Sequence, residues 1–529
     1  MSDSKKQTFL HGTALLALST AIVKLIGAFY SIPLKAIIGD TAFGYYSTAY
    51  EIYTLLLMIS TAGLPVAMSR MISQASSLEK YRQVRKIYAT SRTIFLALGL
   101  LGTALMMIFC RQLAAFQRQP DAWITILALG PACLLICLMS TYRGFFQGQS
   151  NMKPTSVSQV LEAAVKLVCG LGFAIALLSY TSSKPYAAGG AIFGVTMSCL
   201  ISTFYLSHCF RTHYRDLPAG VDIPDSGKTV AKNLLAIAVP ITIGSVGLHI
   251  LTVLETRVYM SQLLEFMPQQ TADLHKGIYN FIQKIFNMPC AFITPITISV
   301  IPAITAQITT GDKVGAKATE ESAVRVTALI SMPCAVGLAV LAEPVTALPG
   351  GYTGENLVLA TNLMRILGVC IVFNAMVLLT NAIMQAHGHV NLPVINMFIG
   401  GFLKLAAIAI LTGNKHIGIL GTPIGSLLCY FSITVLNIFT VRRVLPEAPA
   451  IVKNMLRGAL AAILMGIFTF GAWYGLRYLG ISSRVILCGG PIAVGVLVYL
   501  FAAIKLKAIT RDDCLLLPKG EKIADILHL

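Results

Sequence analysis

The sequence predicts an all-α polytopic membrane protein with about 14 transmembrane helices. Of its 529 residues, 56% are apolar and only 12% are charged, whereas a soluble protein carries about 25% charged residues. Apolar runs also recur from residue 8 to residue 505, and each is long enough to cross a hydrocarbon core of about 30 Å. The chain is therefore expected to be dissolved in a lipid bilayer.

Short polar connectors separate the apolar runs, and none is long enough to form a soluble catalytic domain. The run after Lys5 and Lys6 also resembles a secretory signal, but it continues to residue 38, which favours an uncleaved first helix. The predicted spans cover residues 9–38, 51–72, 92–110, 123–145, 154–180, 186–210, 232–256, 277–305, 325–348, 356–385, 393–412, 417–441, 456–476 and 485–504.

The charged residues predict the orientation of the chain. With an even number of spans both termini share a side, and most of the 40 Lys and Arg residues lie in connectors on that side. Because cytoplasmic loops are enriched in Lys and Arg, we expect cytoplasmic termini. The net charge of +18 then reflects orientation, and we expect no nucleic-acid partner.

Twelve cysteines lie almost entirely within the apolar spans. No CxxC pair and no His-Cys spacing indicates a metal site or a disulfide framework. We therefore expect no metal and no cofactor, although coupling to an ion gradient or to the membrane potential is compatible with the sequence.

Residues 143–166, "RGFFQGQSNMKPTSVSQVLEAAVK", have a degenerate copy 238 positions later at residues 381–404. The shift matches Gln147 to Gln385 and Lys166 to Lys404. Weaker matches pair residues 60–74 with 297–311 and residues 14–19 with 233–238. Three matches in the same order predict two six-helix lobes in a parallel pseudo-two-fold repeat, which is common in secondary transporters.

This repeat predicts the organisation of the chain. The expected parts are an N-terminal lobe at 1–215, a cytoplasmic linker at 216–231, a C-terminal lobe at 232–445, a further helix pair at 446–505 and a cytoplasmic tail at 506–529.

Ionisable residues inside the apolar spans are the candidate binding groups. Each costs about 2.5–3.5 kcal/mol at the bilayer centre on insertion scales and is seldom lipid-facing. Basic groups outnumber acidic ones, which favours an anionic substrate because Lys and Arg pair with phosphate oxygens. The candidates are Lys24, Lys35, Glu51, Glu162, Lys166, Glu255, Arg257, Lys284, Arg365 and Lys404.

Several candidates have a structural alternative. Lys35, Glu51 and Arg257 lie near span ends and can reach the membrane interface. Glu162 and Lys166 are four residues apart on one helix face, where they can neutralise each other. Proline and turn residues supply candidate hinge or gate positions, namely Pro33, Pro65, Arg143, Gln147, Pro154, Pro289, Gln385 and Pro393.

Three phrases of the sequence are similar to a known family. They are "FLHGTALLALSTAIVKLIGAFYSIPLKAIIGD", "GYYSTAYEIYTLLLMISTAGLPVAMSRMIS" and "RGFFQGQSNMKPTSVSQVLE". Together they resemble the stage V sporulation protein B group of polysaccharide transporters. That group belongs to the multidrug/oligosaccharidyl-lipid/polysaccharide (MOP) exporter superfamily and is related to the lipid II flippase MurJ. The resemblance covers essentially the whole chain and is not specific for one substrate.

The resemblance implies a MATE/MurJ-like fold and a flippase for undecaprenyl-pyrophosphate-linked saccharide, either a peptidoglycan precursor or a polysaccharide unit, in a bacterial cytoplasmic membrane. Lys24 matches a first-helix basic residue that engages the pyrophosphate in relatives. Many relatives have the phrase Tyr-Arg-Ile-Pro where this chain has Tyr30-Ser31-Ile32-Pro33. That departure leaves Lys35 or Lys284 as replacements for the second contact.

Three other functions stay open at this point. They are an ion-coupled multidrug exporter of the same superfamily, a membrane-embedded glycosyltransferase or ligase acting on the same lipids, and a purely structural role in a wall-synthesis assembly. A transporter without enzymatic activity is the first expectation, with the lipid-linked saccharide and the bilayer as partners. Cell-wall synthesis proteins are further candidate partners, and we expect a monomer.

Overall fold

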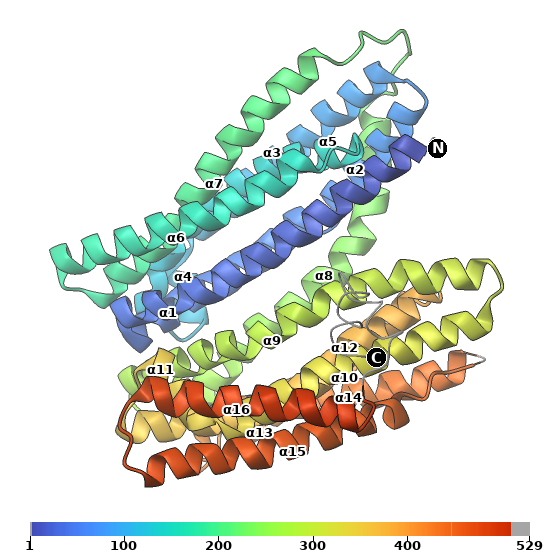
Figure 1. The fold of residues 1–529 in the computed structure, drawn as a ribbon. Helices are drawn as coiled ribbons and strands as arrows, with labels where there is room; N and C mark the ends of the chain where they lie inside the picture. Colours follow the sequence, from blue (N-terminus) through green and yellow to red (C-terminus); the bar gives the residue numbers. More distant parts are fainter. Residues whose placement is uncertain (1–2, 446, 509–529) are drawn as a thin grey trace. The chain divides into compact units, whose positions relative to one another are not determined.

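A computed structural model describes residues 3–445 and 447–508; the side chains of most residues before Phe29, and of a few positions in later helices, lie outside this description. The described part consists of helices and connecting turns without a strand, which confirms the all-α class (Figure 1). The chain forms two compact units, Met1–Gly277 and Ile278–Leu529. Each unit is considered by itself.

The first unit contains the helices of the predicted N-terminal lobe and the first helix after it. The buried residues of its helices are mostly apolar, and short turns join neighbours such as α6 and α7 in antiparallel pairs (Figure 1). The elements are α1 (Asp3–Thr61), α2 (Leu64–Ser77), α3 (Tyr81–Ile108), α4 (Cys110–Phe116), η1 (Pro120–Ala122), α5 (Trp123–Gly148), α6 (Lys153–Thr181), α7 (Lys184–Arg215) and α8 (Gly227–Leu263), followed by the start of α9 (Gln269–Thr309).

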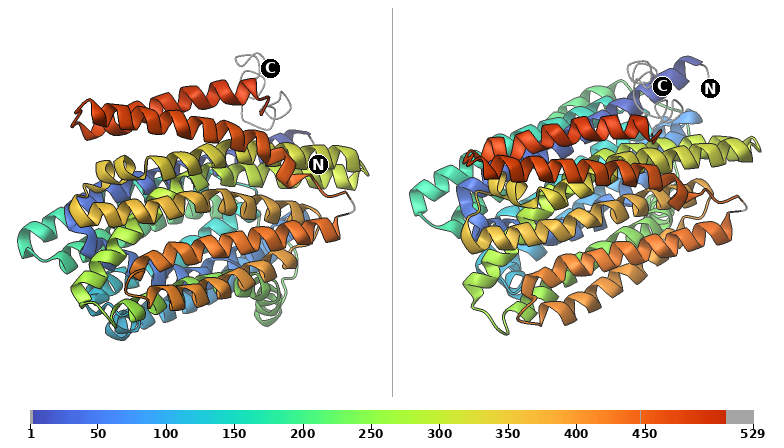
Figure 2. Two further views of the ribbon diagram at one scale, coloured as in Figure 1. Left: turned by 90° about the horizontal axis from the view of Figure 1, so that it is seen from below. Right: turned by 60° about the horizontal axis from the view of Figure 1, so that its bottom comes forward.

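The second unit continues α9 and ends with a helix pair. In every view α15 and α16 lie side by side (Figure 2). The elements are α10 (Lys313–Val340), α11 (Ala342–Gly350), α12 (Gly354–Ala386), α13 (Asn391–Thr412), η2 (Gly418–Leu420), α14 (Gly421–Val444), α15 (Ile451–Tyr478) and α16 (Arg484–Lys505).

Eleven helical segments in the described residues are long and apolar enough to cross a membrane. The multi-pass class is thereby confirmed, while the number fourteen stays a prediction. The predicted end of the first span at residue 38 coincides with an interruption of the helical backbone at Gly39 (φ 78°). The expected connector at 39–50 is wrong in one respect, because residues 40–50 continue as helix within α1. α1 ends at Thr61, and Pro65 lies in the first turn of α2, where its missing N–H group costs no hydrogen bond.

The turn between α5 and α6 has the same hydrogen bonds as the turn between α12 and α13. In both turns, three consecutive N–H groups donate to carbonyl groups four, three and five residues earlier; the donors are residues 149–151 and 387–389. The left-handed position is Ser150 (φ 58°) in the first turn and Gly388 (φ 83°) in the second. The predicted shift of 238 positions, which aligns Gln147 with Gln385, therefore also aligns the backbone hydrogen bonds of these two turns.

A second pair of turns also matches, at a different shift. The α2–α3 and α9–α10 turns have left-handed residues at Glu79 and Gly311, and the N–H donors at positions 79–81 correspond to those at 311–313. α3 and α10 also end at matching positions, because Phe109 and Leu341 are the same number of residues apart as Glu79 and Gly311. The sequence match of 60–74 with 297–311 is thus out of register here, because apolar helix sequences match in more than one register.

The predicted linker folds back onto α3. The Asp222 carboxylate accepts hydrogen bonds from the backbone N–H groups of Arg82 (2.9 Å) and Gln83 (2.8 Å), which would otherwise be unsatisfied at the helix N-terminus. Gln83 exchanges two further hydrogen bonds with Asp225, and Arg85 donates to linker carbonyl groups. The linker segment 217–225 is therefore clasped to α3, and α8 begins at Gly227.

Candidate functional site

A cavity of about 360 Å³ lies within the first unit among α1, α5, α6 and α7. Its volume falls in the range of small-molecule sites, about 300–1,000 Å³. Two cationic groups and one carboxylate in its lining leave one positive charge in excess. The polar and aromatic side chains of the lining are Tyr30, Tyr50, Tyr53, Arg143, Gln159, Glu162 and Lys166.

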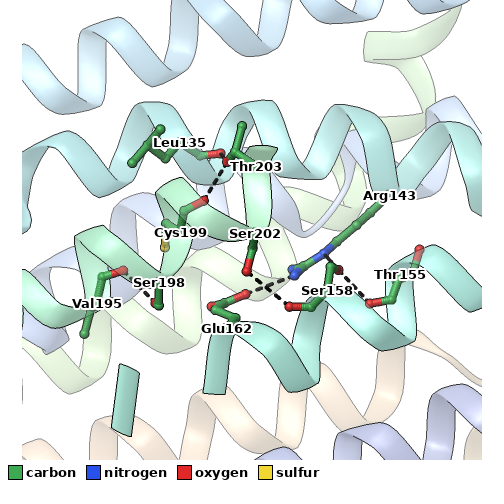
Figure 3. A network of polar contacts seen from close by, with 10 residues as sticks. All are labelled: Leu135, Arg143, Thr155, Ser158, Glu162, Val195, Ser198, Cys199, Ser202 and Thr203. Atoms are coloured by element: carbon green, nitrogen blue, oxygen red, sulfur yellow. Dashed lines mark hydrogen bonds and ion pairs between the residues drawn. The ribbon is translucent and has the colours of Figure 1, made fainter. Parts of the chain in front are cut away.

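Arg143, in the last turns of α5, connects the polar groups at this cavity (Figure 3). Its Nη2 lies 3.0 Å from Oε2 of Glu162, and its Nε donates to Oγ of Ser158 at 3.1 Å. Ser158 and Glu162 are four residues apart on α6, so they share a helix face. Ser202 of α7 donates to the Ser158 carbonyl group at 3.3 Å. The three helices are therefore joined by one hydrogen-bonded network.

Lys166 lies one turn beyond Glu162 and contacts two tyrosine rings. Its Nζ is 4.7 Å from the ring centroid of Tyr50 and 5.4 Å from that of Tyr30. Such cation–π contacts hold an ammonium ion without neutralising its charge. Glu162 forms an ion pair with Arg143 and also attracts the charge of Lys166, so the predicted interaction between Glu162 and Lys166 is not excluded by the pairing with Arg143.

A second polar cluster joins α1 to the start of α9. Lys276 is fully buried and donates to Oγ1 of Thr48. The Asp273 carboxylate accepts hydrogen bonds from the Tyr45 hydroxyl group (3.1 Å) and from Nε2 of Gln119 (2.8 Å). Because buried charges are expensive unless they are hydrogen-bonded, these contacts fix the two helices against each other.

Small residues bring the same two helices together. A Cβ atom at Gly277 would overlap the Asp40 carbonyl group, and one at Gly44 would lie 3.3 Å from the Asp273 carbonyl oxygen. We call this region the α1–α9 contact; it comprises Asp40, Gly44, Tyr45, Thr48, Gln119, Asp273, Lys276 and Gly277.

Three predicted site residues of the first unit lie outside the cavity and contact other groups. Lys35 forms an ion pair with Asp40 at 3.5 Å. Oε2 of Glu51 accepts a hydrogen bond from Thr256 at 2.8 Å. Arg257 donates to the Phe116 carbonyl group at 2.6 Å and covers its ring at 4.3 Å. Glu51 and Arg257 thus connect neighbouring helices within the unit, whereas the Lys35 ion pair lies within α1; whether any of the three binds substrate or reaches the membrane interface stays a prediction.

The remaining predicted site residues are spread over both units. Glu255 is buried in α8, and Lys24 lies in α1 with its side chain outside the described part. In the second unit, Lys284 and Lys404 are half-buried, whereas Arg365 is exposed on α12. Of the ten candidates, the cavity brings together Glu162 and Lys166.

The second unit carries a neutral polar cluster in the position of the Arg143 network. Nδ2 of Asn437 donates to Thr380 and Asn381, each at 2.8 Å, and Nδ2 of Asn396 donates to Asn437 at 2.9 Å. The same shift of 238 positions that aligns Gln147 with Gln385 also aligns Arg143 with Asn381. The two halves therefore carry equivalent networks, one charged and one built of amides.

The predicted hinge residues lie at helix starts, at helix ends and within helices. Gln147 and Gln385 accept equivalent turn hydrogen bonds, and Pro65 and Pro154 lie in the first turns of α2 and α6. Pro393 lies in the first turn of α13, and Pro33 and Pro289 lie inside α1 and α9. A hinge or gate role for these positions stays a prediction.

Sequence reasoning missed the tyrosines and Gln159 at the cavity, and Asp273 and Lys276 at the α1–α9 contact. Tyrosine and glutamine are not ionisable groups that indicate a site inside a span, and Asp273 and Lys276 fall between the predicted spans 232–256 and 277–305. The phrase "YYSTAYEIY" could have indicated an aromatic lining, because the spacing of Tyr46, Tyr50 and Tyr53 places them on one helix face. Within the described ranges, no group of three or more His, Cys, Asp or Glu residues is placed to hold a metal ion.

The fold is that of membrane transporters of the MOP superfamily. The chain superposes on the lipid II flippase MurJ in an inward closed conformation with a TM-score of 0.68, at 15% identity, covering 93% of this chain and 98% of that structure. An inward-facing MATE family multidrug resistance transporter gives a TM-score of 0.62 at 15% identity, covering 80% and 97%.

The chain belongs to the family described as "Polysaccharide biosynthesis protein", which matches residues 9–307, more than half of its length. It is similar to stage V sporulation protein B of Bacillus subtilis (strain 168), with 25% identity over 97% of this chain and 98% of the relative. It is also similar to the lipid II flippase MurJ of that organism, with 24% identity over 75% and 76%.

Proposed function

We propose that this protein is a flippase that moves an undecaprenyl-pyrophosphate-linked saccharide from the inner to the outer leaflet by alternating access. The observation that carries the proposal is the cationic, tyrosine-lined cavity inside the membrane-spanning helices of a chain from this family.

A polar head group needs such a cavity because it cannot cross hydrocarbon unaided. Lys166 supplies a positive charge for phosphate oxygens, and Lys24 supplies another by resemblance to relatives. The Arg143 network adds hydrogen-bonding groups that can replace part of the hydration shell of a sugar. The cavity thus offers the chemistry that a saccharide pyrophosphate requires.

The second unit contains an apolar pocket suited to the lipid tail. It has a volume of about 390 Å³ and lies among α9, α10, α11, α15 and α16, with Gly337, Met465 and Val496 in its lining. Because apolar chains gain about 0.8 kcal/mol per buried CH₂ group, a prenyl chain gains free energy by binding in this pocket.

Alternating access requires a contact that opens and closes. The α1–α9 contact fits this role, because it combines close helix packing at Gly277 with buried polar groups at Asp273 and Lys276. We propose that the α1–α9 contact is closed in the form described here. Its two helices would separate when the cavity opens to the other side of the membrane.

Release of the substrate is easier if a carboxylate competes for the cations. Glu162 is paired with Arg143 at 3.0 Å, so Arg143 can exchange Glu162 for an anionic substrate. Glu162→Gln should therefore raise substrate affinity and slow transport. Unchanged substrate affinity and unchanged transport in this variant would contradict competition between Glu162 and the substrate for Arg143.

A multidrug exporter is the second candidate function, favoured by the MATE-like fold. The excess positive charge of the cavity opposes binding of cationic drugs, whereas an exporter of such drugs would carry acidic groups. Extrusion of a cationic dye from loaded vesicles would support the exporter. A glycosyltransferase would instead leave a changed glycan on the lipid.

The decisive experiment reconstitutes the full chain in vesicles with lipid II and, separately, with a capsule-type lipid. Head groups that become accessible from the other side are measured for the parent, Lys24→Ala and Lys166→Met, beside empty vesicles. Lys153→Met is a matched control, because Lys153 is exposed at the start of the same helix as Lys166.

We expect the parent and Lys153→Met to move at least one of the two lipids, with loss of transport in Lys24→Ala and Lys166→Met. Equal rates in the parent, both cavity variants and empty vesicles would refute a flippase.

A further inference from the structure

A second pocket in the first unit lies apart from the tyrosine-lined cavity. Its volume is about 450 Å³, and it is formed by the end of α2, the start of α3, the linker and the start of α8. We call it the linker pocket; its lining residues lie in the ranges 71–87, 223–225 and 233–237. It shares no lining residue with the cavity around Lys166, so the binding groups described above do not account for it.

The linker pocket lies where the sequence places the edge of the bilayer. The second predicted span ends at residue 72 and the seventh begins at residue 232, and the lining starts at Met71 in α2 and at Asn233 in α8. Span ends border the polar head-group layer that covers each side of the hydrocarbon core. A molecule in this pocket can therefore contact both head groups and hydrocarbon.

The floor of the linker pocket is apolar. Met71 and Ala75 of α2 and Ile87 of α3 are its buried lining residues, and the half-buried Ile237 adds an apolar side chain from α8. Because removal of apolar surface from water is favourable, this floor favours a hydrocarbon chain over a sugar or an inorganic ion.

The clasped linker adds exposed apolar side chains. Leu78 and Ile223 line the pocket and are 65% and 94% exposed, and Val221 is 96% exposed. Asp222, between the two linker residues, accepts hydrogen bonds from the N-terminus of α3. This contact holds the segment in place with Val221 and Ile223 uncovered. Exposed apolar side chains gathered at one place are typical of an interaction surface.

The segments that form the linker pocket carry an excess of cations. Residues 71–87 and 221–237 include six Lys and Arg residues and three carboxylates. Two of these carboxylates, Asp222 and Asp225, already accept hydrogen bonds from groups of α3. Lys80 is exposed in the lining itself. Because lysine forms charge-assisted hydrogen bonds with phosphate oxygens, the pocket combines an apolar floor with a contact for a phosphate group.

We propose that the linker pocket binds an anionic phospholipid of the adjoining leaflet, which is the predicted cytoplasmic one. The phosphate group contacts Lys80, and one acyl chain lies against the apolar floor beneath Ile223. The amides of Gln74 and Asn233, which are exposed in the lining, are available to hydroxyl groups of the head group. This lipid stays in its leaflet and is not transported, so the inference goes beyond the proposed function and does not rest on it.

Native mass spectrometry of the detergent-purified full chain tests the proposal by counting bound lipids. The probes are phosphatidylglycerol and phosphatidylcholine with identical acyl chains, and glycerol 3-phosphate as a head group without chains. We expect the first phosphatidylglycerol to bind about tenfold more tightly than the first phosphatidylcholine, because the quaternary ammonium group of phosphatidylcholine would face the excess cations.

Substitutions at the pocket separate the contacts. Lys80→Met should weaken binding of the first phosphatidylglycerol about tenfold, whereas Lys80→Arg should retain it. Lys153→Met removes an exposed lysine outside the lining and should bind like the parent. Ala236→Phe should fill the pocket and displace the lipid; Ala89→Phe is its control, because Ala89 is exposed on α3 outside the lining.

Three results would overturn the proposal. The first is equal binding of the two lipids by the parent, or parent-like binding of phosphatidylglycerol by Lys80→Met. The second is displacement of phosphatidylglycerol by glycerol 3-phosphate, which would identify a soluble phosphate compound as the ligand. The third is a dimer of the parent that is lost in Ala236→Phe, which would show that a second copy of this chain covers the pocket. Because Lys80 is exposed, Lys80→Met should unfold at the parent's temperature, so its loss of lipid reports the contact rather than misfolding.

Discussion

Replacing Gly277 by alanine tests the α1–α9 contact. The added methyl group would overlap the carbonyl group of Asp40, so the two helices must separate by about 1 Å to restore an ordinary contact. The hydrogen bonds of Asp273 to Gln119 and Tyr45, now 2.8 and 3.1 Å, would then lengthen beyond a useful distance. The substitution should therefore favour the open form of the contact.

The size of the effect follows from overpacking, which costs about 1–3 kcal/mol. That free energy corresponds to about a 5- to 150-fold rise in the population of the open form. Ser47 is the reporter, because it directly precedes Thr48 of the contact in α1 and is buried, and because its hydroxyl group has no hydrogen-bond partner within the described structure. Maleimide labelling of Ser47→Cys in purified protein measures the opening.

We expect labelling to be at least about fivefold faster in the Gly277→Ala background. Gly172→Ala is the matched control, because a Cβ atom there meets nothing within 4 Å. Equal labelling rates in the parent, control and Gly277→Ala backgrounds would refute the reasoning.

Three further substitutions test other parts of the structure. Asn437→Ala should lower the free energy of unfolding by about 1–3 kcal/mol, because Thr380 and Asn396 lose buried partners; an unchanged midpoint of thermal unfolding would contradict this. Gly337→Leu should fill the apolar pocket and slow lipid transport, with Gly471→Leu, where nothing lies within 4 Å of the added Cβ atom, as the control. Desolvation raises the pKa of Asp222, but hydrogen bonds from the Arg82 and Gln83 backbone outweigh it and hold the pKa below its ordinary value of 3.8. The hydrogen bonds between Asp222 and the start of α3 should therefore persist above this value and weaken as the pH falls through the lowered pKa. Faster hydrogen exchange at residues 81–83 should report this loss. In Asp222→Ala the faster exchange should already appear at neutral pH.

The sequence predicted the repeat well where polar residues break the apolar pattern. Gln147 and Gln385 lie in matching turns, so the predicted shift between the two halves is right to the residue there. The shift at residues 60–74 was less accurate because it rested on apolar helix residues, which match in several registers. Polar residues in the turns therefore predicted the alignment of the two halves more reliably than the apolar helix residues did.

Pairing between charges was harder to predict than their presence. Spacing along α6 made Lys166 the natural neighbour of Glu162, but Arg143 approaches Glu162 from α5 after a tight turn. The tyrosines around Lys166 come from α1, far earlier in the chain. Local periodicity says which face a residue occupies, and only the packing of distant helices says which group it meets.

The matching turns have a consequence for how this gene evolved. Such matching turns are what a tandem duplication of one helical unit would produce. At both left-handed turn positions the first copy has a residue with a side chain, Glu79 and Ser150, where the second has Gly311 and Gly388. The first copy also has the Arg143–Glu162 ion pair, in place of Asn381 and Gly400 in the second. We expect changes of head-group specificity among descendants of this gene to accumulate in the first copy.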